Sequence, residues 1–183
     1  MKIILLAILF ASSFVGLSQS LPDIKFSQYK TPVFSSLKTA KIDFKSSKTA
    51  RQFRTILTEN YKNAKPDFAS YYKTVIWGCG IGCIAGAMID FRDGKVYDLP
   101  INPNNTYGGC FTNASNDDKE DRFEINKNSA LFLTNNCQEE QSETNNKVKQ
   151  TKTFFIFIWD EKVKKFKFQK KNTRKRNIKN REE

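Results

Sequence analysis

The chain has 183 residues, with 31 Lys and Arg against 19 Asp and Glu, and it contains no histidine. The absence of histidine excludes the Ser-His-Asp and Cys-His pairs that usually activate a nucleophile. The formal charge of +12 is uneven, because residues 163–181 hold ten Lys or Arg and no acid, so the body before them is close to neutral.

The first 20 residues predict a secretory signal peptide. Met1 and Lys2 precede the apolar run "IILLAILFASSFVGL", which is too short for a membrane span, and the small-x-small trio Ser18, Gln19 and Ser20 follows it. We therefore expect an exported protein, periplasmic or extracellular, whose mature chain has no transmembrane segment. Residues 21–45 mix Ser, Thr, Pro and Lys with isolated apolar residues and are expected to form an extended lead-in.

A helix is the first regular element that the sequence predicts. Thr49 and Gln52 have the spacing of a capping box, and apolar residues recur at helical spacing from Phe53 to Tyr61. This pattern predicts an amphipathic helix over residues 50–64. Such a helix is stable only when its apolar face is packed against another element.

The rest of the chain predicts antiparallel strands. "FASYYKTVIWG", "CIAGAMIDF" and "VYDLP" are rich in aromatic and apolar residues, and Asp93-Gly94 marks a hairpin turn. "DRFEI", "ALFLT" and the terminal hairpin "TFFIFIWDEKVKKFKFQK" follow. The expected fold class is α+β, with one N-terminal amphipathic helix packed on an antiparallel sheet of about six or seven strands. It would occupy residues 46–169 as a single domain, and residues 170–183 would form a basic disordered tail.

Five segments together resemble a known family. "FRTILTEN", "FASYY", "VIWGCGIGC", "MIDFRDGKVYDLP" and "FIWDEKVKKFKF" are similar, in this order, to an uncharacterised family of small exported bacterial proteins with a W-G-C-G-x-x-C segment. The resemblance implies export and a single domain, and it implies no particular activity. Asp67, Ser70 and Tyr71 depart from the family, which often has Asn, Gly and His there.

The cysteines favour disulfides over a metal site or a redox centre. Structural zinc needs four Cys or His ligands at paired spacings, and a thioredoxin-like centre needs C-x-x-C at the start of a helix. Cys79 and Cys83 are instead separated by three residues between two predicted strands. Facing each other across a hairpin, they would lie within disulfide range. Of the three pairings that four cysteines permit, we expect Cys79 with Cys83 and Cys110 with Cys137.

An aromatic group beside this hairpin is the candidate binding site. Trp77 is either a core residue or, with Tyr71 and Tyr72, part of a pocket that the hairpin presents rigidly. On an unbroken strand Tyr71 and Trp77 share one face and Tyr72 takes the other. Arg54 joins the candidate binding residues as a partner for a nearby carboxylate.

Catalysis has little support in the sequence. Paired carboxylates could still hydrolyse a glycosidic bond, and the chain offers Asp90, Asp93, Asp98 and Glu124 on or near strands. Asp90 lies among apolar residues, and we expect it to pair with Arg54 or Arg92 rather than to act as a general acid. No cofactor is indicated.

The sequence therefore predicts an exported bacterial binding module, of an inhibitor, immunity or envelope-associated type, acting through a stapled aromatic hairpin. The alternatives are a hydrolase with paired carboxylates and a structural envelope component. The partner would be a protein or an envelope ligand, with the basic tail drawn to anionic envelope surfaces. Nucleic acid is not expected for an exported protein. The tail's first part, near Val163 to Phe168, alternates like an edge strand whose lysines face water.

Overall fold

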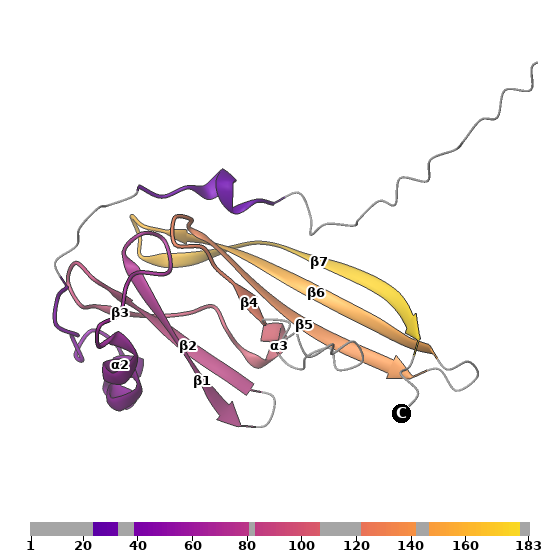
Figure 1. Cartoon of the computed structure of the whole chain (residues 1–183), viewed down its shortest axis with the longest axis horizontal. Helices are drawn as coiled ribbons and strands as arrows, with labels where there is room; N and C mark the ends of the chain where they lie inside the picture. Colours follow the sequence, from indigo (N-terminus) through magenta and orange to yellow (C-terminus); the bar gives the residue numbers. More distant parts are fainter. Residues whose placement is uncertain (1–23, 33–38, 81–82, 107–121, 142–146, 180–183) are drawn as a thin grey trace, which may run out of the picture.

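The chain forms two antiparallel sheets in the computed structural model (Figure 1). The three-stranded sheet has the order β1-β2-β3, and the four-stranded sheet has the order β4-β5-β6-β7. The strands are β1 (Tyr72–Gly80), β2 (Cys83–Asp90), β3 (Val96–Asp98), β4 (Phe123–Glu124), β5 (Leu131–Gln141), β6 (Lys147–Asp160) and β7 (Lys165–Lys179). The residues described are 24–32, 39–80, 83–106, 122–141 and 147–179.

The helices are all short. They are η1 (Phe26–Tyr29), α1 (Lys48–Gln52), α2 (Arg54–Tyr61) and α3 (Pro103–Thr106). The single helix expected over residues 50–64 is broken at Phe53, whose φ of −112° and ψ of 35° are not helical. Ser47, and not Thr49, caps α1, because its hydroxyl accepts a 3.0 Å hydrogen bond from the Ala50 amide.

The expected fold class is therefore wrong. A single sheet of six or seven strands with one long amphipathic helix on it is replaced by two sheets, of three and four strands, with only small helices. The physical reason is that both faces of β1 and β2 carry apolar side chains. Helices cover one face, and the second sheet covers the other.

Three apolar clusters mark the layers. The first, with Leu57, Val75 and Trp77, lies between the short helices and the three-stranded sheet. The second, with Tyr72 and Trp159 among its members, lies between the two sheets. The third lies on the outer face of the four-stranded sheet, where Leu131, Leu133 and Ile156 are covered by Ile24, Phe26 and Tyr29 of the N-terminal segment.

The strand pairing follows the predicted alternation. β1 and β2 pair in one register from Tyr72 opposite Asp90 to Gly78 opposite Ile84, and an irregularity follows at the tip. β6 pairs with β5 on one side and with β7 on the other. The hairpin expected at the C-terminal end is therefore present, and its second strand is longer than expected.

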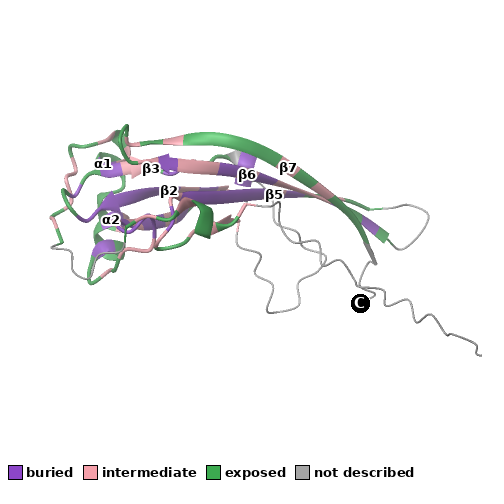
Figure 2. Ribbon diagram, turned by 90° about the horizontal axis from the view of Figure 1, so that it is seen from above, coloured by how far each residue is buried: buried purple, intermediate pink, exposed green. Residues whose placement is uncertain are grey.

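Two segments outside the expected domain take part in the fold. In the lead-in, Lys30 forms an antiparallel bridge with Ser129, and the Asp43 amide donates to the carbonyl of Gly94 at 2.9 Å. Residues 170–179, expected to be disordered, form the second half of β7 and pair with β6. Figure 2 shows most of the surface of β7 as exposed.

Candidate functional site

Five polar side chains meet where the three-stranded sheet faces the turn between β6 and β7. Tyr72 begins β1, Asp90 ends β2, and Arg92 lies in the turn that follows β2. Glu161 and Lys164 come from the β6–β7 turn, more than 60 residues further along the chain. We call these five residues the bridging network, because their contacts connect the two sheets.

Asp90 is the buried end of the network. Its side chain is 1 % exposed, and it accepts from the Arg92 side chain through both carboxylate oxygens, at 2.8 and 2.5 Å. The Arg92 amide donates to it as well, at 2.9 Å, and the Lys164 ammonium lies 3.3 Å from Oδ2. A buried carboxylate needs such pairing, because leaving water without a compensating charge is costly.

Glu161 binds four donors from the two sheets. It accepts from the Tyr72 hydroxyl at 2.6 Å, from the Trp159 indole at 2.8 Å, from Arg92 at 2.6 Å and from Lys164 at 2.5 Å. The Tyr72 oxygen in turn accepts from Arg92 at 3.0 Å and from Lys164 at 2.8 Å. Every charge in the network therefore has an opposite charge within contact distance.

The pKa values follow from these contacts. Burial by itself would raise the pKa of Asp90 and of Glu161, but hydrogen bonds to Arg92, and for Glu161 first to Lys164, outweigh it and hold both carboxyls below their ordinary pKa. The pKa of Tyr72 is raised, first by burial and then by the hydrogen bond to Glu161. Both acids are therefore ionised, and the phenol is protonated, at neutral pH.

Aromatic rings surround the network. The Arg92 guanidinium lies over the ring of Tyr71, 3.9 Å from its centre, and Tyr72 packs edge-to-face against Trp159 with ring centres 5.3 Å apart. The Lys164 ammonium lies 5.4 Å from the centre of the Tyr72 ring. The charged side chains of the network are thus packed against rigid aromatic rings, which restrict their positions.

Three of the five predicted binding residues meet here, and two do not. Tyr71, Tyr72 and Asp90 lie in or against the network. Trp77 lies in the other cluster, 9 % exposed, with its ring 4.6 Å from that of Phe53. Arg54 lies over the ring of Phe44, at 4.7 Å, so of the two arginines expected to pair with Asp90 it is Arg92 that does so.

The expected alternation holds only for part of β1. Trp77 and Tyr72 lie in clusters on opposite faces of the sheet, as expected. Tyr71, however, packs with Tyr72's cluster instead of sharing the face of Trp77. The reason is that β1 begins only at Tyr72, so Tyr71 belongs to the preceding turn, where the positive φ values of Ala69 and Ser70, 43° and 67°, redirect the chain.

A disulfide joins Cys79 and Cys83 across the hairpin, with Cα atoms 5.1 Å apart, which confirms the first expected pairing. Cys137 is also disulfide-bonded. Cys110 lies outside the described residues, so the second pairing stays a prediction. No group of three or more metal-binding side chains occurs among the residues that the structure describes.

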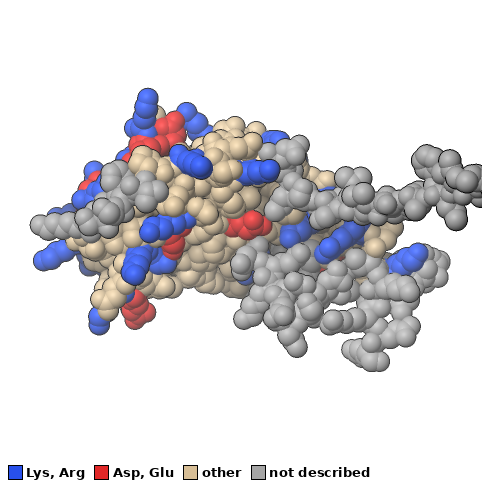
Figure 3. Space-filling view, turned by 45° about the horizontal axis from the view of Figure 1, so that its top comes forward, with Lys and Arg blue, Asp and Glu red and all other residues tan. Residues whose placement is uncertain are grey.

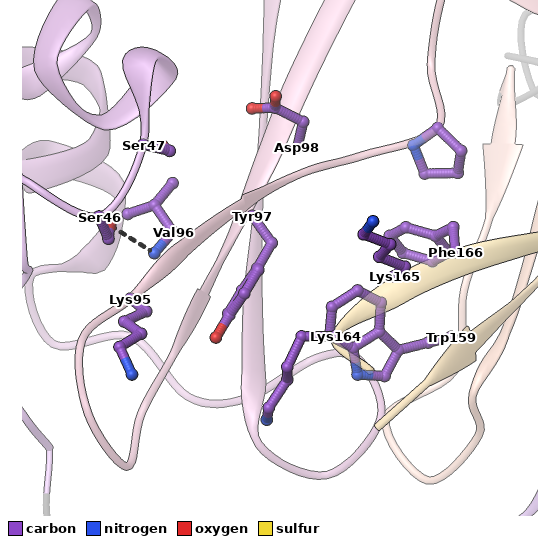
Figure 4. A pocket seen from close by; sticks show the side chains of 11 residues that line it. Ser46, Ser47, Lys95, Val96, Tyr97, Asp98, Trp159, Lys164, Lys165 and Phe166 are labelled. Carbon is purple, nitrogen blue, oxygen red and sulfur yellow. Dashed lines mark hydrogen bonds between the residues drawn. The ribbon is translucent and has the colours of Figure 1, made fainter. Parts of the chain in front are cut away.

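An open groove of about 440 Å³ lies beside the network (Figure 4). Tyr97 of β3 and Trp159 and Phe166 of the β6–β7 hairpin form one continuous aromatic wall of this groove, and Lys164 also lines it. The remaining lining residues are Ser46, Ser47, Lys95, Val96, Asp98, Pro100 and Lys165. In Figure 4, Tyr97 and Asp98 point to opposite sides of their strand.

Sequence reasoning missed Glu161, Lys164, Tyr97 and Trp159. Glu161 and Lys164 belong to a polar segment whose sequence predicts only an ordinary turn. One signal was available, because Glu161 is the last acid before residue 182 in an otherwise basic stretch. No local pattern could show that Trp159, rather than Trp77, lies beside a groove.

The comparisons with known proteins gave no match: no family model, no curated protein and no solved structure is similar to the chain. The family resemblance of the W-G-C-G segment therefore stays a prediction. Among the described residues, the longest helices fall well short of the apolar length needed to cross a membrane.

Proposed function

We propose that the chain is an exported binding module that holds an anionic ligand with a flat ring in the groove beside the bridging network. The observation that carries the proposal is the combination of lysine amines and aromatic rings in one open hollow between the two sheets. Ligand sites are typically concave and aromatic, with a few charged groups that orient the ligand. A groove of about 440 Å³ is large enough for one or two rings.

Two lysines are available to an anion. Among the residues that the structure describes, Lys165 forms no ion pair, and Lys95 pairs only with Asp93, at 3.1 Å and in an exposed position. An exposed ion pair of this kind contributes little stabilisation, so the Lys95 ammonium can exchange Asp93 for a ligand anion at little cost. Asp98, the one acid in the lining, points away from Tyr97, and the overall charge of +12 attracts anions to the protein.

The aromatic wall is held in place before any ligand arrives. The ring centres of Tyr97 and Trp159 are 5.4 Å apart, and those of Trp159 and Phe166 are 5.0 Å apart. The hydrogen bond from the Trp159 indole to Glu161 fixes the central ring. A site that is already ordered loses little conformational entropy on binding, which favours affinity.

The other candidate functions have less support. A hydrolase with paired carboxylates needs one acid with a raised pKa, whereas the pKa values of Asp90 and Glu161 are both lowered and both acids contact Arg92 and Lys164. A ligand site at the disulfide-linked β1–β2 hairpin also has less support, because its central aromatic residue, Trp77, is buried. Export remains part of the proposal, supported by the N-terminal sequence and by the disulfide.

Calorimetric titration tests the proposal with three probes: phenyl phosphate, inorganic phosphate and benzyl alcohol. We expect phenyl phosphate to bind at least about tenfold more tightly than either of the others, because it alone satisfies both the lysines and the rings. Lys165→Ala and Tyr97→Ala should each weaken its binding, and Lys62→Ala, which changes an exposed lysine that does not line the groove, should not. Equal binding of all three probes, or no binding of phenyl phosphate, would refute the proposal.

A further inference from the structure

The outer edge of β7 is a second surface with a distinct chemistry. β7 lies at the end of the order β4-β5-β6-β7, so within the described residues its only strand neighbour is β6. The free edge of such a strand presents unpaired backbone N–H and C=O groups. At 15 residues β7 is also the longest strand described, so this edge is extensive.

β7 is unusually basic for an edge strand. Eight of its 15 residues are Lys or Arg and none is acidic; they are Lys165, Lys167, Lys170, Lys171, Arg174, Lys175, Arg176 and Lys179. In Figure 3, basic side chains are spread over the face turned to the reader, with few acidic ones between them. Lys170, Lys171 and Lys175 are exposed and form no ion pair with any residue that the structure describes.

These free lysines lie on both faces of the strand. Lys171 and Lys175 are opposite Phe155 and Thr151 of β6, and therefore share one face. Lys170 is opposite Ile156, on the other face. A flat anionic membrane would meet only one of these faces. An extended peptide paired with the edge places its own side chains alternately on the same two faces, and so would meet lysines on both.

The same charges select against a second copy of the chain. Two β7 edges brought together would place lysines opposite lysines, which destabilises strand pairing. An acidic strand replaces each repulsion with an attraction. We therefore propose that the outer edge of β7 binds an acidic peptide segment in extended conformation, by adding it to the sheet as a further strand. This interaction is independent of the groove.

The experiment uses the full-length protein and a labelled peptide of about twelve residues built from Glu, Thr and Val, long enough to cover most of the strand. Fluorescence anisotropy gives its Kd, and amide hydrogen exchange locates it. We expect protection of amides within residues 167–177. The same peptide with all its backbone nitrogens methylated keeps its charge but loses its backbone donors on both edges, and should bind at least about tenfold more weakly.

Charge reversal provides the matched comparison. The double variant Lys171→Glu, Lys175→Glu should raise the Kd of the peptide by about tenfold or more. Lys62→Glu with Lys65→Glu changes the net charge by the same amount at exposed sites near α2, and should have a much smaller effect. Circular dichroism checks that each variant is folded.

Three results would overturn the proposal. The first is a Kd of the parent peptide equal to that of the methylated peptide or of a polyphosphate of the same charge. Such equality would mean that the edge attracts any polyanion. The second is tighter binding of the protein to phosphatidylglycerol vesicles than to the peptide, without protection of β7 amides. It would mean that the basic residues of β7 bind a membrane surface instead of a peptide. Absence of peptide binding at low salt would remove the interaction altogether.

Discussion

The Tyr72 hydroxyl donates a 2.6 Å hydrogen bond to the Glu161 carboxylate, although the two residues are 89 positions apart in the sequence. Tyr72 belongs to the three-stranded sheet, and Glu161 belongs to the turn between β6 and β7. This contact is one of several in the bridging network that connect the sheets directly. The orientation of Trp159, and hence the shape of the groove, depends on the same carboxylate.

Removal of this hydroxyl should destabilise the protein without changing its fold. Tyr72→Phe removes the hydroxyl of buried Tyr72, which takes a donor from the partly exposed Glu161 and an acceptor from Arg92 and Lys164. We expect a loss of about 1–3 kcal/mol in the free energy of unfolding, measured with urea. Tyr97→Phe is the control, because no hydrogen bond of its hydroxyl occurs among the described residues, and it should change stability little. Equal losses in the two variants would contradict the role of the network.

The network should also make stability depend on pH in the acidic range. The pKa values of Asp90 and Glu161 are lowered in the folded protein, so their pairs stabilise it fully above the ordinary carboxyl pKa of about 4. This stabilisation is lost as the pH falls through the lower folded values. In urea unfolding between about pH 7 and pH 3, Asp90→Asn should be less stable at neutral pH and should lose less stability on acidification.

The control for this pH dependence is Asp93→Asn. Asp93 pairs with Lys95 in an exposed position, and such pairs contribute at most about 1 kcal/mol. Its stability curve should therefore run close to that of the wild type. If the Asp90→Asn curve also runs parallel to the wild type at every pH, the buried pair does not stabilise the fold.

The hairpin disulfide should contribute only modestly. Cys79 and Cys83 are four positions apart, and the loop-entropy estimate for so short a closure is about 2 kcal/mol. A double Cys79→Ser, Cys83→Ser variant should lose about that amount in urea unfolding and should keep both tryptophans, Trp77 and Trp159, buried, as judged by the fluorescence maximum. Complete unfolding of the variant would show that the bridge does more than constrain the tip.

Gly94 should tolerate no side chain. Its φ of 75° favours glycine, and a Cβ at this position would overlap the backbone carbonyl of Lys41 in the lead-in. We expect Gly94→Ala to cost at least about 2 kcal/mol in the free energy of unfolding. Gly78→Ala is the matched control, because a Cβ there meets nothing within 4 Å, and it should stay within about 0.5 kcal/mol of the wild type.

The strands could be predicted from the sequence because their signals are local. Alternation and turn residues placed β1, β2 and the β6–β7 hairpin correctly. The arrangement of the sheets could not be predicted in the same way, since it depends on which apolar face meets which. The helix prediction failed at Phe53, where the residue packs on Trp77 instead of continuing the helix.

The site was predicted in part for a related reason. Asp90 and Arg92 are two positions apart, so their pairing is local and could be expected. Glu161 and Lys164 reach them only after the second sheet has folded over the first, and no spacing in the sequence indicates that approach. For Trp77 the sequence allows either a core residue or a ligand contact, because an alternating strand does not reveal which face remains accessible, and its burial agrees with the core alternative.

Chemical-shift mapping with phenyl phosphate tests the proposed binding groove most directly. In ¹H–¹⁵N spectra of the labelled protein, we predict that the shifts that change during the titration belong to groove residues, including the Tyr97, Lys165 and Phe166 amides and the Trp159 indole. Signals from the stapled tip at Gly78 and Cys79 should stay in place. Changes confined to that tip, or spread over every lysine-rich surface, would contradict the account.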